Sequence, residues 1–389
     1  MTRVMALGLF SILIMQAQDN NRKGLYFNFD FTPNASLIGN NVPYGEKFSL
    51  YDRVKLSPPD VNVPVRTIIG SYGLTTTPLV AKMRNHHAYA GEVGYWLNNS
   101  WGLSLGASYF NTHGSDSGLV TSPPSDDSNY YVNGVGLFGH QNTPVYNQLE
   151  AKGTDPLSPV GYHGENGVSV MRGNAMLMRN LVSTGHQHLD LLVGVDATKL
   201  ANYRSDGRTE RAFLYYFYGL DHRDNHISVG QNGRADYSLM LGPSLGMQWQ
   251  TKVWKGFTLE VKARQSFDFG NVRRSGEFID VDDVNRVKGP IGGPFTTVYK
   301  SDYLYGSAPY SHNDSAVVPV TDMSIRLKKN VCKHMALGIG FTTAYMHNVP
   351  AAPTIDFPGA WELTGSTRWL SQNRNLMLSG MTASISYTR

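Results

Sequence analysis

Residues 235–250 read ADYSLMLGPSLGMQWQ, and residues 257–269 read FTLEVKARQSFDF. In both segments apolar side chains alternate with polar or small ones. Successive side chains of a strand point to opposite faces of its sheet. The stretch therefore predicts two strands, each with one apolar and one polar face, joined by a turn at residues 252–256.

The length of this alternation narrows the fold class. A soluble strand usually has roughly five or six residues, and both segments run well beyond that. A strand that crosses a bilayer needs about ten residues, apolar toward lipid and polar toward the lumen. The pair therefore favours a transmembrane barrel. A large soluble β-sandwich or barrel is the alternative, because its strands also alternate.

Composition excludes several other classes. The 389 residues include one cysteine, Cys332, so neither an intrachain disulfide nor a multi-cysteine metal site can form. The net charge of +4 is small and dispersed, which gives no indication of nucleic-acid binding. Beyond the N-terminus no run of about 18 apolar residues predicts a membrane helix. We expect no cofactor and no metal.

The N-terminus has the pattern of a secretory signal peptide. Arg3 supplies a positive start, and residues 5–15 form an apolar core that is too short to span a bilayer. We assign residues 1–18 to this segment and residues 19–389 to one barrel domain. A signal peptide directs the chain out of the cytoplasm, as an outer-membrane location requires.

Eight more segments bring the expected strand count to ten. They are residues 25–31, 87–97, 101–109, 167–181, 189–199, 317–327, 335–345 and 376–387, with 167–181 the least regular. Short turns near 98–100, 183–187, 252–256 and 329–333 alternate with long loops near 32–85, 111–166, 201–234, 271–315 and 347–375. Short periplasmic turns and long extracellular loops are the layout of an outer-membrane barrel.

The predicted fold is therefore all-β, an antiparallel transmembrane β-barrel of about 10 to 12 strands. Residues 213–218 and 361–369 would supply the additional pair. The strand containing Leu25 must pair with the strand containing Leu376, because an open edge would leave backbone groups bare in hydrocarbon. Aromatic residues near strand ends fit interface girdles: Tyr89, Tyr95, Trp101, Tyr109, Trp249, Phe257, Phe269, Tyr345 and Tyr387.

Charged residues on the polar faces are the candidate functional residues. Inside a barrel such groups line water or pair with one another. The set is Glu92, Asp190, Asp196, Asp236, Glu260, Lys262, Arg264, Asp268, Asp322, Arg326 and Lys328. These residues either fill a narrow lumen as a salt-bridged plug or line an open pore. Neither sign dominates, so strong ion selectivity is not predicted.

Three other motifs are weaker. Residues 242–246, GPSLG, match a nucleophile elbow, but that motif needs a strand–turn–helix context and here lies within an alternating strand. His186, His188 and Asp190 share one face at a spacing of two, which a polar strand end explains equally well. The acidic residues between 280 and 285 lack the glycine position of a calcium loop.

In layout the chain resembles bacterial outer-membrane β-barrel proteins, and most of all the Legionella-type major outer membrane protein family and planctomycete-type barrels. The residues that carry this resemblance are the signal peptide, WGLSLG at 101–106, LGPSLG at 241–246, and the closing strand 381–387. It implies a porin-like or structural surface role. Such barrels usually end in an aromatic residue read by the assembly machinery, whereas Tyr387 here is followed by two more residues.

The sequence thus predicts a non-enzymatic outer-membrane barrel with membrane lipid, the barrel-assembly machinery and small solutes or ions as partners. Its oligomeric state stays open. Two functions of other classes remain: an outer-membrane, lipase-like enzyme and a secreted β protein that binds glycans through aromatic loops.

Overall fold

The computed structural model describes residues 23–39, 43–56, 66–68, 73–120, 129–137, 160–215, 221–288, 296–307, 309–356 and 368–389. The expected signal peptide lies outside these residues. Within them, no helix is long and apolar enough to cross a membrane. The barrel is built from β1 (Gly24–Ile38), β5 (His86–Trp96), β6 (Trp101–Val120), β8 (Val160–Ser183), β9 (Gln187–Tyr215), β10 (Asp221–Tyr237), β11 (Met240–Trp254), β12 (Phe257–Lys288), β14 (Tyr310–Asn330), β15 (Met335–Pro350) and β18 (Asn373–Thr388).

The sheet closes on itself. β1 pairs with β5 on one side and with β18 on the other, for example Phe29 opposite Ile385. The main sheet has 12 strands; β10 and β11 occupy one position in the ring and β13 (Thr296–Ser307) lies beside it on β12, which leaves ten positions. The prediction of an antiparallel barrel of about 10 to 12 strands, closed between its first and last strands, is confirmed, with ten positions in the ring.

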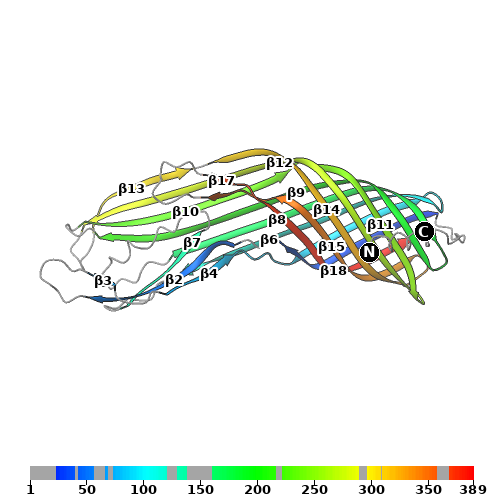
Figure 1. The fold of residues 1–389 in the computed structure, drawn as a ribbon, viewed down its shortest axis with the longest axis horizontal. Helices are drawn as coiled ribbons and strands as arrows, with labels where there is room; N and C mark the ends of the chain where they lie inside the picture. The colour runs from blue at the N-terminus through cyan, green and yellow to red at the C-terminus, as the bar shows by residue number, and fades with distance from the viewer. Residues whose placement is uncertain are drawn as a thin grey trace, which may run out of the picture.

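Short turns gather at the end of the barrel where the C-terminus lies (Figure 1). At one of them the side-chain oxygen of Asn98 accepts hydrogen bonds from the backbone N–H groups of Ser100 and Trp101. At another, Gly256 takes a φ of 78°, a left-handed conformation that side chains disfavour. These turns lie where the sequence predicted them.

The expected loops 111–166, 201–234 and 271–315 are wrong in large part, because strands continue through them. β12 alone has 32 residues and β9 has 29, and together with β10 and β14 they form a sheet that extends beyond the barrel (Figure 1). Outside the bilayer both faces of a strand meet water, so apolar alternation no longer marks it. Backbone pairing with long neighbours holds these segments extended instead.

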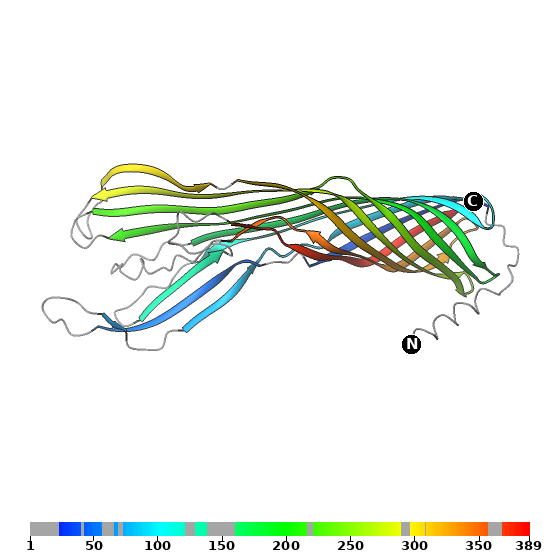
Figure 2. The ribbon, with the colours of Figure 1, turned by 45° about the horizontal axis from the view of Figure 1, so that its top comes forward.

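The remaining strands lie in three of the segments that were expected to be loops: 32–85, 111–166 and 347–375. β2 (Pro43–Leu56), β3 (Arg66–Ile68), β4 (Gly73–Val80) and β7 (Asn129–Leu137) form a separate four-stranded sheet, and β16 (Thr354–Asp356) pairs with β17 (Arg368–Leu370). Figure 2 shows β2, β4 and β7 diverging from the long sheet. Of the two segments that could have added strands, 213–218 is described only to Tyr215, as part of β9, and 361–369 only over the start of β17.

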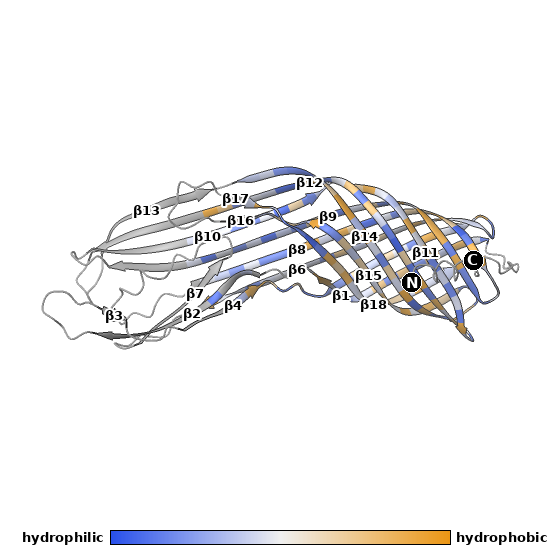
Figure 3. Cartoon of the chain, viewed as in Figure 1, coloured by the Kyte–Doolittle hydropathy of each residue, from blue (hydrophilic) through white to orange (hydrophobic). Residues whose placement is uncertain are grey.

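Apolar residues form a band on the barrel toward its turn end (Figure 3). It includes Leu105 on β6, Val195 on β9, Leu245 on β11 and Ile339 on β15, each more than half exposed. Six of the predicted girdle aromatics, Tyr89, Tyr95, Trp101, Tyr109, Trp249 and Phe269, also point outward. An outer surface this apolar is stable in contact with lipid and costly in water.

This band gives a first prediction. Replacing Leu245, midway along β11, with Arg should lower the free energy of unfolding by about 2–4 kcal/mol, because the charge would face the middle of the bilayer. Val253→Arg, beside the turn, is the matched control and should cost about 0–1 kcal/mol. Guanidinium unfolding of the protein in lipid vesicles measures both. Equal losses at the two depths would contradict the placement of the band.

A break between β10 and β11 changes the alternation that the sequence predicted for residues 235–250. β10 ends at Tyr237 and β11 begins at Met240, with Ser238 bonded through its backbone N–H to the carbonyl of Asn271. Odd-numbered residues face inward before this break and even-numbered residues face inward after it. The expected continuous strand is therefore two strands of opposite phase, and Ala235 and Tyr237 are buried inside the barrel.

Candidate functional site

Ten of the eleven charged residues expected in the lumen lie on inward-facing positions: Glu92, Asp190, Asp196, Glu260, Lys262, Arg264, Asp268, Asp322, Arg326 and Lys328. Asp236 is the exception. Because the break at residues 238–239 reverses the phase, its side chain faces outward and forms an exposed ion pair with Arg234, 2.6 Å apart. Eight of the inward residues fall into two networks at different heights.

The lower network is centred on Glu260 of β12, whose side chain is buried. Arg326 Nη1 donates to Glu260 Oε1 at 2.7 Å, and Lys328 Nζ donates to Oε2 at 2.9 Å. The amide groups of Gln248 and Gln250 also donate to Oε2. Arg326 then bridges to Asp30 of β1 at 2.6 Å. This carboxylate therefore receives four side-chain donors and is almost fully buried.

A second contact of the lower network spans the whole lumen. Lys262 Nζ of β12 lies 2.6 Å from Glu92 Oε2 of β5. These strands are five positions apart whichever way the ring is counted, so the pair joins opposite walls. Tyr26 adds its hydroxyl, which donates to Glu92 Oε1 at 2.8 Å.

The upper network pairs two arginines with two aspartates. Arg172 of β8 contacts Asp322 at 2.6 Å and Asp196 at 3.1 Å, and Arg264 of β12 contacts the same two carboxylates at 2.7 Å and 2.9 Å. β8 and β14 are not neighbours in the sheet, so Arg172 reaches across the lumen. Each of these four ions contacts two ions of opposite charge. This arrangement offsets the cost of burial far better than a single ion pair does.

Five members of these networks were missed from the sequence: Tyr26, Asp30, Arg172 and the two amide donors Gln248 and Gln250. Tyr26 and Asp30 lie on the polar face of the well-patterned first strand, so its alternation could have identified them. Arg172 lies in the irregular segment 167–181, where no clear phase assigned its side chain. Asp190, which was expected, is held by Asn180 Nδ2 at 2.6 Å, and Asp268 accepts from Thr198 Oγ1 at 2.6 Å.

Above the charges the interior becomes apolar. A cluster of buried residues on inward positions includes Phe110, Leu200, Met240, Val318 and Met346. The expectation of a polar inner face is wrong at this height. These side chains are buried and pack against one another, so burial stabilises them as in a soluble core.

The chain after β15 folds inward over this layer. The carbonyl oxygen of Pro350 accepts hydrogen bonds from Tyr237 Oη at 2.6 Å and from Asn202 Nδ2 at 2.8 Å. Farther along, the backbone N–H of Ile355 donates to Gln231 Oε1 at 3.0 Å. Gly233 faces the carbonyl of Pro353 with no room for a Cβ. Residues 349–355 thus form a cap, held by side chains of β9 and β10.

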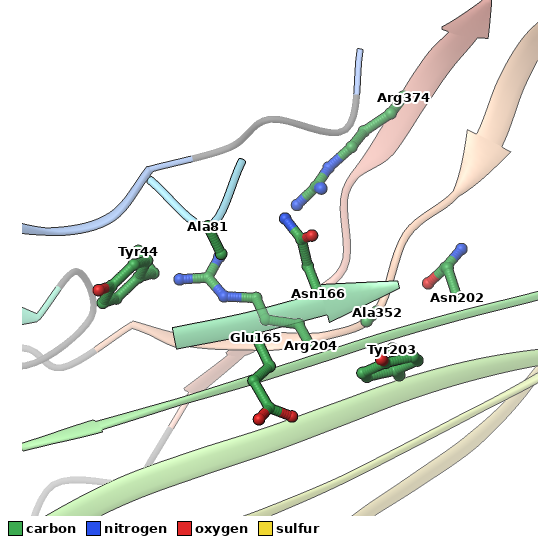
Figure 4. Close-up of a pocket in the computed structure, with 9 residues that line it drawn as sticks. All are labelled: Tyr44, Ala81, Glu165, Asn166, Asn202, Tyr203, Arg204, Ala352 and Arg374. Atoms are coloured by element: carbon green, nitrogen blue, oxygen red, sulfur yellow. The ribbon is translucent and has the colours of Figure 1, made fainter. Parts of the chain in front are cut away.

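A small pocket remains beside the cap, lined in part by Arg204, Asn166 and Arg374 (Figure 4). Arg204 on β9 and Arg374 on β18 come from opposite walls of the ring. The space is about 10 Å³, roughly enough for one water molecule.

Space also remains within the lumen itself. A cavity of about 190 Å³ lies between small residues such as Ala90 and Gly106 on β5 and β6 and the charged side chains of β12 and β14. It is large enough for several water molecules. Lys262 and Arg264 reach into it, so its occupants meet fixed charges that already have partners.

The residues of the three weaker motifs lie in ordinary positions in strands or beside turns. Ser244 is buried on the inner face of β11, in a strand rather than at the turn that a nucleophile elbow needs. His188 bonds to Ser183, while His186 is exposed. Residues 280–285 form part of β12 instead of a loop. Among the described residues no group of three or more His, Cys, Asp or Glu could hold a metal ion.

No protein-family model and no curated protein matches the chain. Among solved structures it is similar to the outer-membrane protease OmpT from Escherichia coli, at 8% identity over 96% of this chain and 99% of that one, with a TM-score of 0.40. It is also similar to the toluene transporter TodX from Pseudomonas putida, at 9% identity over 94% and 89% with a TM-score of 0.23. A FadL homologue from Pseudomonas aeruginosa gives 7% over 94% and 90%, with a TM-score of 0.21. No residue role or activity is carried over from these proteins.

Proposed function

We propose that the protein is an integral outer-membrane β-barrel with a sealed lumen, which acts as a structural surface protein rather than as an open diffusion pore. The apolar outer band supports its insertion in lipid. One observation carries the sealed state: the lumen is filled at successive heights by the two charged networks, the apolar layer and the cap of residues 349–355.

The energetics favour closure. An open pore would have to return Glu260, Asp196 and their cationic partners to water together, because each ion contacts more than one partner. Opening would also expose the apolar layer to water, at roughly 25 cal/mol for each Å² of apolar surface. Passive passage of small solutes therefore requires a rearrangement of both layers.

Conductance of the detergent-purified protein in a planar bilayer tests this function, with heat-modifiable gel mobility measured alongside. We expect a heat-modifiable band, as folded outer-membrane barrels give, and no discrete current steps. Steady, discrete steps from the unmodified protein would contradict the sealed lumen and favour a porin-like role. Protein that stays soluble without detergent would contradict the membrane location.

A further inference from the structure

A groove opens beside the upper half of β14. The ladder between β14 and β15 ends where Val320 faces Met346, whereas β14 continues to Tyr310 along β12. β15 instead pairs with the first residues of β18, Asn373 and Arg374. The separation leaves a groove of about 520 Å³, within the roughly 300–1,000 Å³ of small-ligand sites.

A continuous chain of polar groups lines this groove. His312 Nε2 lies 2.8 Å from Asp314 Oδ1, and Arg274 Nε lies 3.3 Å from the other carboxylate oxygen. Arg274 Nη2 donates to Asn373 Oδ1 at 3.2 Å, and Asn373 Nδ2 donates to Asn348 Oδ1 at 2.9 Å. The groove therefore presents oriented imidazole, carboxylate, guanidinium and amide groups along one line.

The backbone holds one of these groups in an uncommon conformation. Asn348 has a φ of 54°, in the left-handed region that asparagine adopts more readily than most residues other than glycine. Its backbone N–H donates to Asn375 Oδ1 at 3.0 Å, which fixes the position. Here the conformation accompanies the bond between the side chains of Asn348 and Asn373.

An aromatic group stands at the end of the groove. The ring of Tyr310 stacks on Trp369 with centroids 5.3 Å apart and 29° between the planes. Its hydroxyl lies 3.2 Å from Ser371 Oγ. The tyrosine therefore offers the groove a rigid apolar surface with a polar edge.

The charge in the groove narrows the class of ligand. Its lining contains one carboxylate, Asp314, and one guanidinium, Arg274, already paired with each other. A metal ion would need more oxygen ligands than this, and a phosphate would need a cation without a partner. Planar amides and a paired carboxylate can donate to and accept from hydroxyl groups, and an aromatic ring packs against C–H surfaces. This combination suits a ligand with many hydroxyls and little charge.

We propose that this groove binds a saccharide, either free or as the head group of a glycolipid. The site faces the extracellular side of the apolar band and uses none of the charged residues of the lumen. The inference goes beyond the structural role proposed above and does not depend on whether the lumen conducts.

The single cysteine allows a direct test. Cys332 is exposed at a turn on the opposite end of the barrel, so a fluorophore attached there leaves the groove untouched. The labelled, detergent-purified full chain is applied to an immobilised panel of defined neutral and acidic oligosaccharides, and bound members are then titrated in free form. We expect at least one neutral member to bind in the free form.

Two groove variants and one control locate the binding. Asn373→Ala and Tyr310→Ala should each weaken the affinity by roughly tenfold, the effect of losing about one hydrogen-bonding or packing group. Asn313→Ala, on the outward face of the same strand, should leave it unchanged. Heat-modifiable mobility confirms folding of each variant.

Two results would overturn the proposal. They are the absence of binding across the panel and equal affinities in all three folded variants. Conductance is measured separately, so a failed saccharide test and a failed sealed-lumen test are distinguishable.

Discussion

The Glu260→Gln protein should be less stable than the unmodified protein by about 3–5 kcal/mol, the usual cost of removing one partner from a buried ion pair. Glutamine keeps the size of the side chain but removes the charge that Arg326 and Lys328 share. Arg326 would retain only Asp30, and Lys328 would lose its carboxylate. Equilibrium unfolding in guanidinium, followed by tryptophan fluorescence in lipid vesicles, measures the loss.

Asp236→Asn is the matched control, since it makes the same acid-to-amide change on an outward position. Its ion pair with Arg234 is exposed, and such pairs contribute roughly 0–1 kcal/mol. A comparable loss in the two variants would show that the lumen network contributes no more than a surface pair. Retained stability in Glu260→Gln would contradict the burial of this network.

A channel should appear only when two sets of groups are removed together: the charged groups that bridge the lumen, and the layers that close it above them. The first change is Arg172→Ser with Arg264→Ser and Lys262→Ser, which removes the guanidinium groups that bridge Asp196 and Asp322 and the ammonium group that spans the lower network. The second replaces residues 349–371 with a short Gly-Ser linker and changes Phe110 and Met346 to serine, and so opens the cap and the apolar layer. Planar-bilayer recordings of the combined protein should show discrete steps that the unmodified protein lacks.

The sign of the current follows from the charges left behind. Without the two arginines, Asp196 and Asp322 face the lumen unneutralised, so the channel should prefer cations. Each change alone should leave conductance at background, because the other closure persists. Arg179→Ser, at an outward position that contacts Trp101, serves as the control for arginine loss. Conductance from the first change alone would show that the apolar layer and the cap do not seal the lumen.

The barrel was predictable because each strand of a membrane barrel faces lipid on one side and the lumen on the other, and this difference appears in the sequence as alternation. Lipid outside and polar groups inside impose a period of two on each strand, and the turns required at the periplasmic end punctuate it. This is why the ring of strands and the closing contact of the Leu25 and Leu376 strands could be predicted, although the run 235–250 is divided between β10 and β11. The same logic placed ten of the eleven charged residues on the inner face.

The predictions fail where the two faces of a strand no longer meet different surroundings, or where the alternation changes phase. Beyond the bilayer both faces of β9 and β12 meet water. The sequence therefore does not alternate there, and these extensions were predicted to be loops. Near Ser238 a local break changes the phase without interrupting the apolar run, which hid the outward position of Asp236. The partners within the networks depend on the stagger of strands around the ring, as for Lys262 and Glu92. Periodicity along one strand carries no information about that stagger.

The length of β12 has a mechanical consequence. From Gly270 to Lys288 the strand continues beyond the apolar band for about 60 Å, at roughly 3.3 Å per residue, paired with β10 over its outer part. A pull on its outer end along the strand direction would load the hydrogen bonds of that ladder in shear, so many must fail together rather than one after another. The projection can therefore pass tension applied at its outer end directly into the barrel wall.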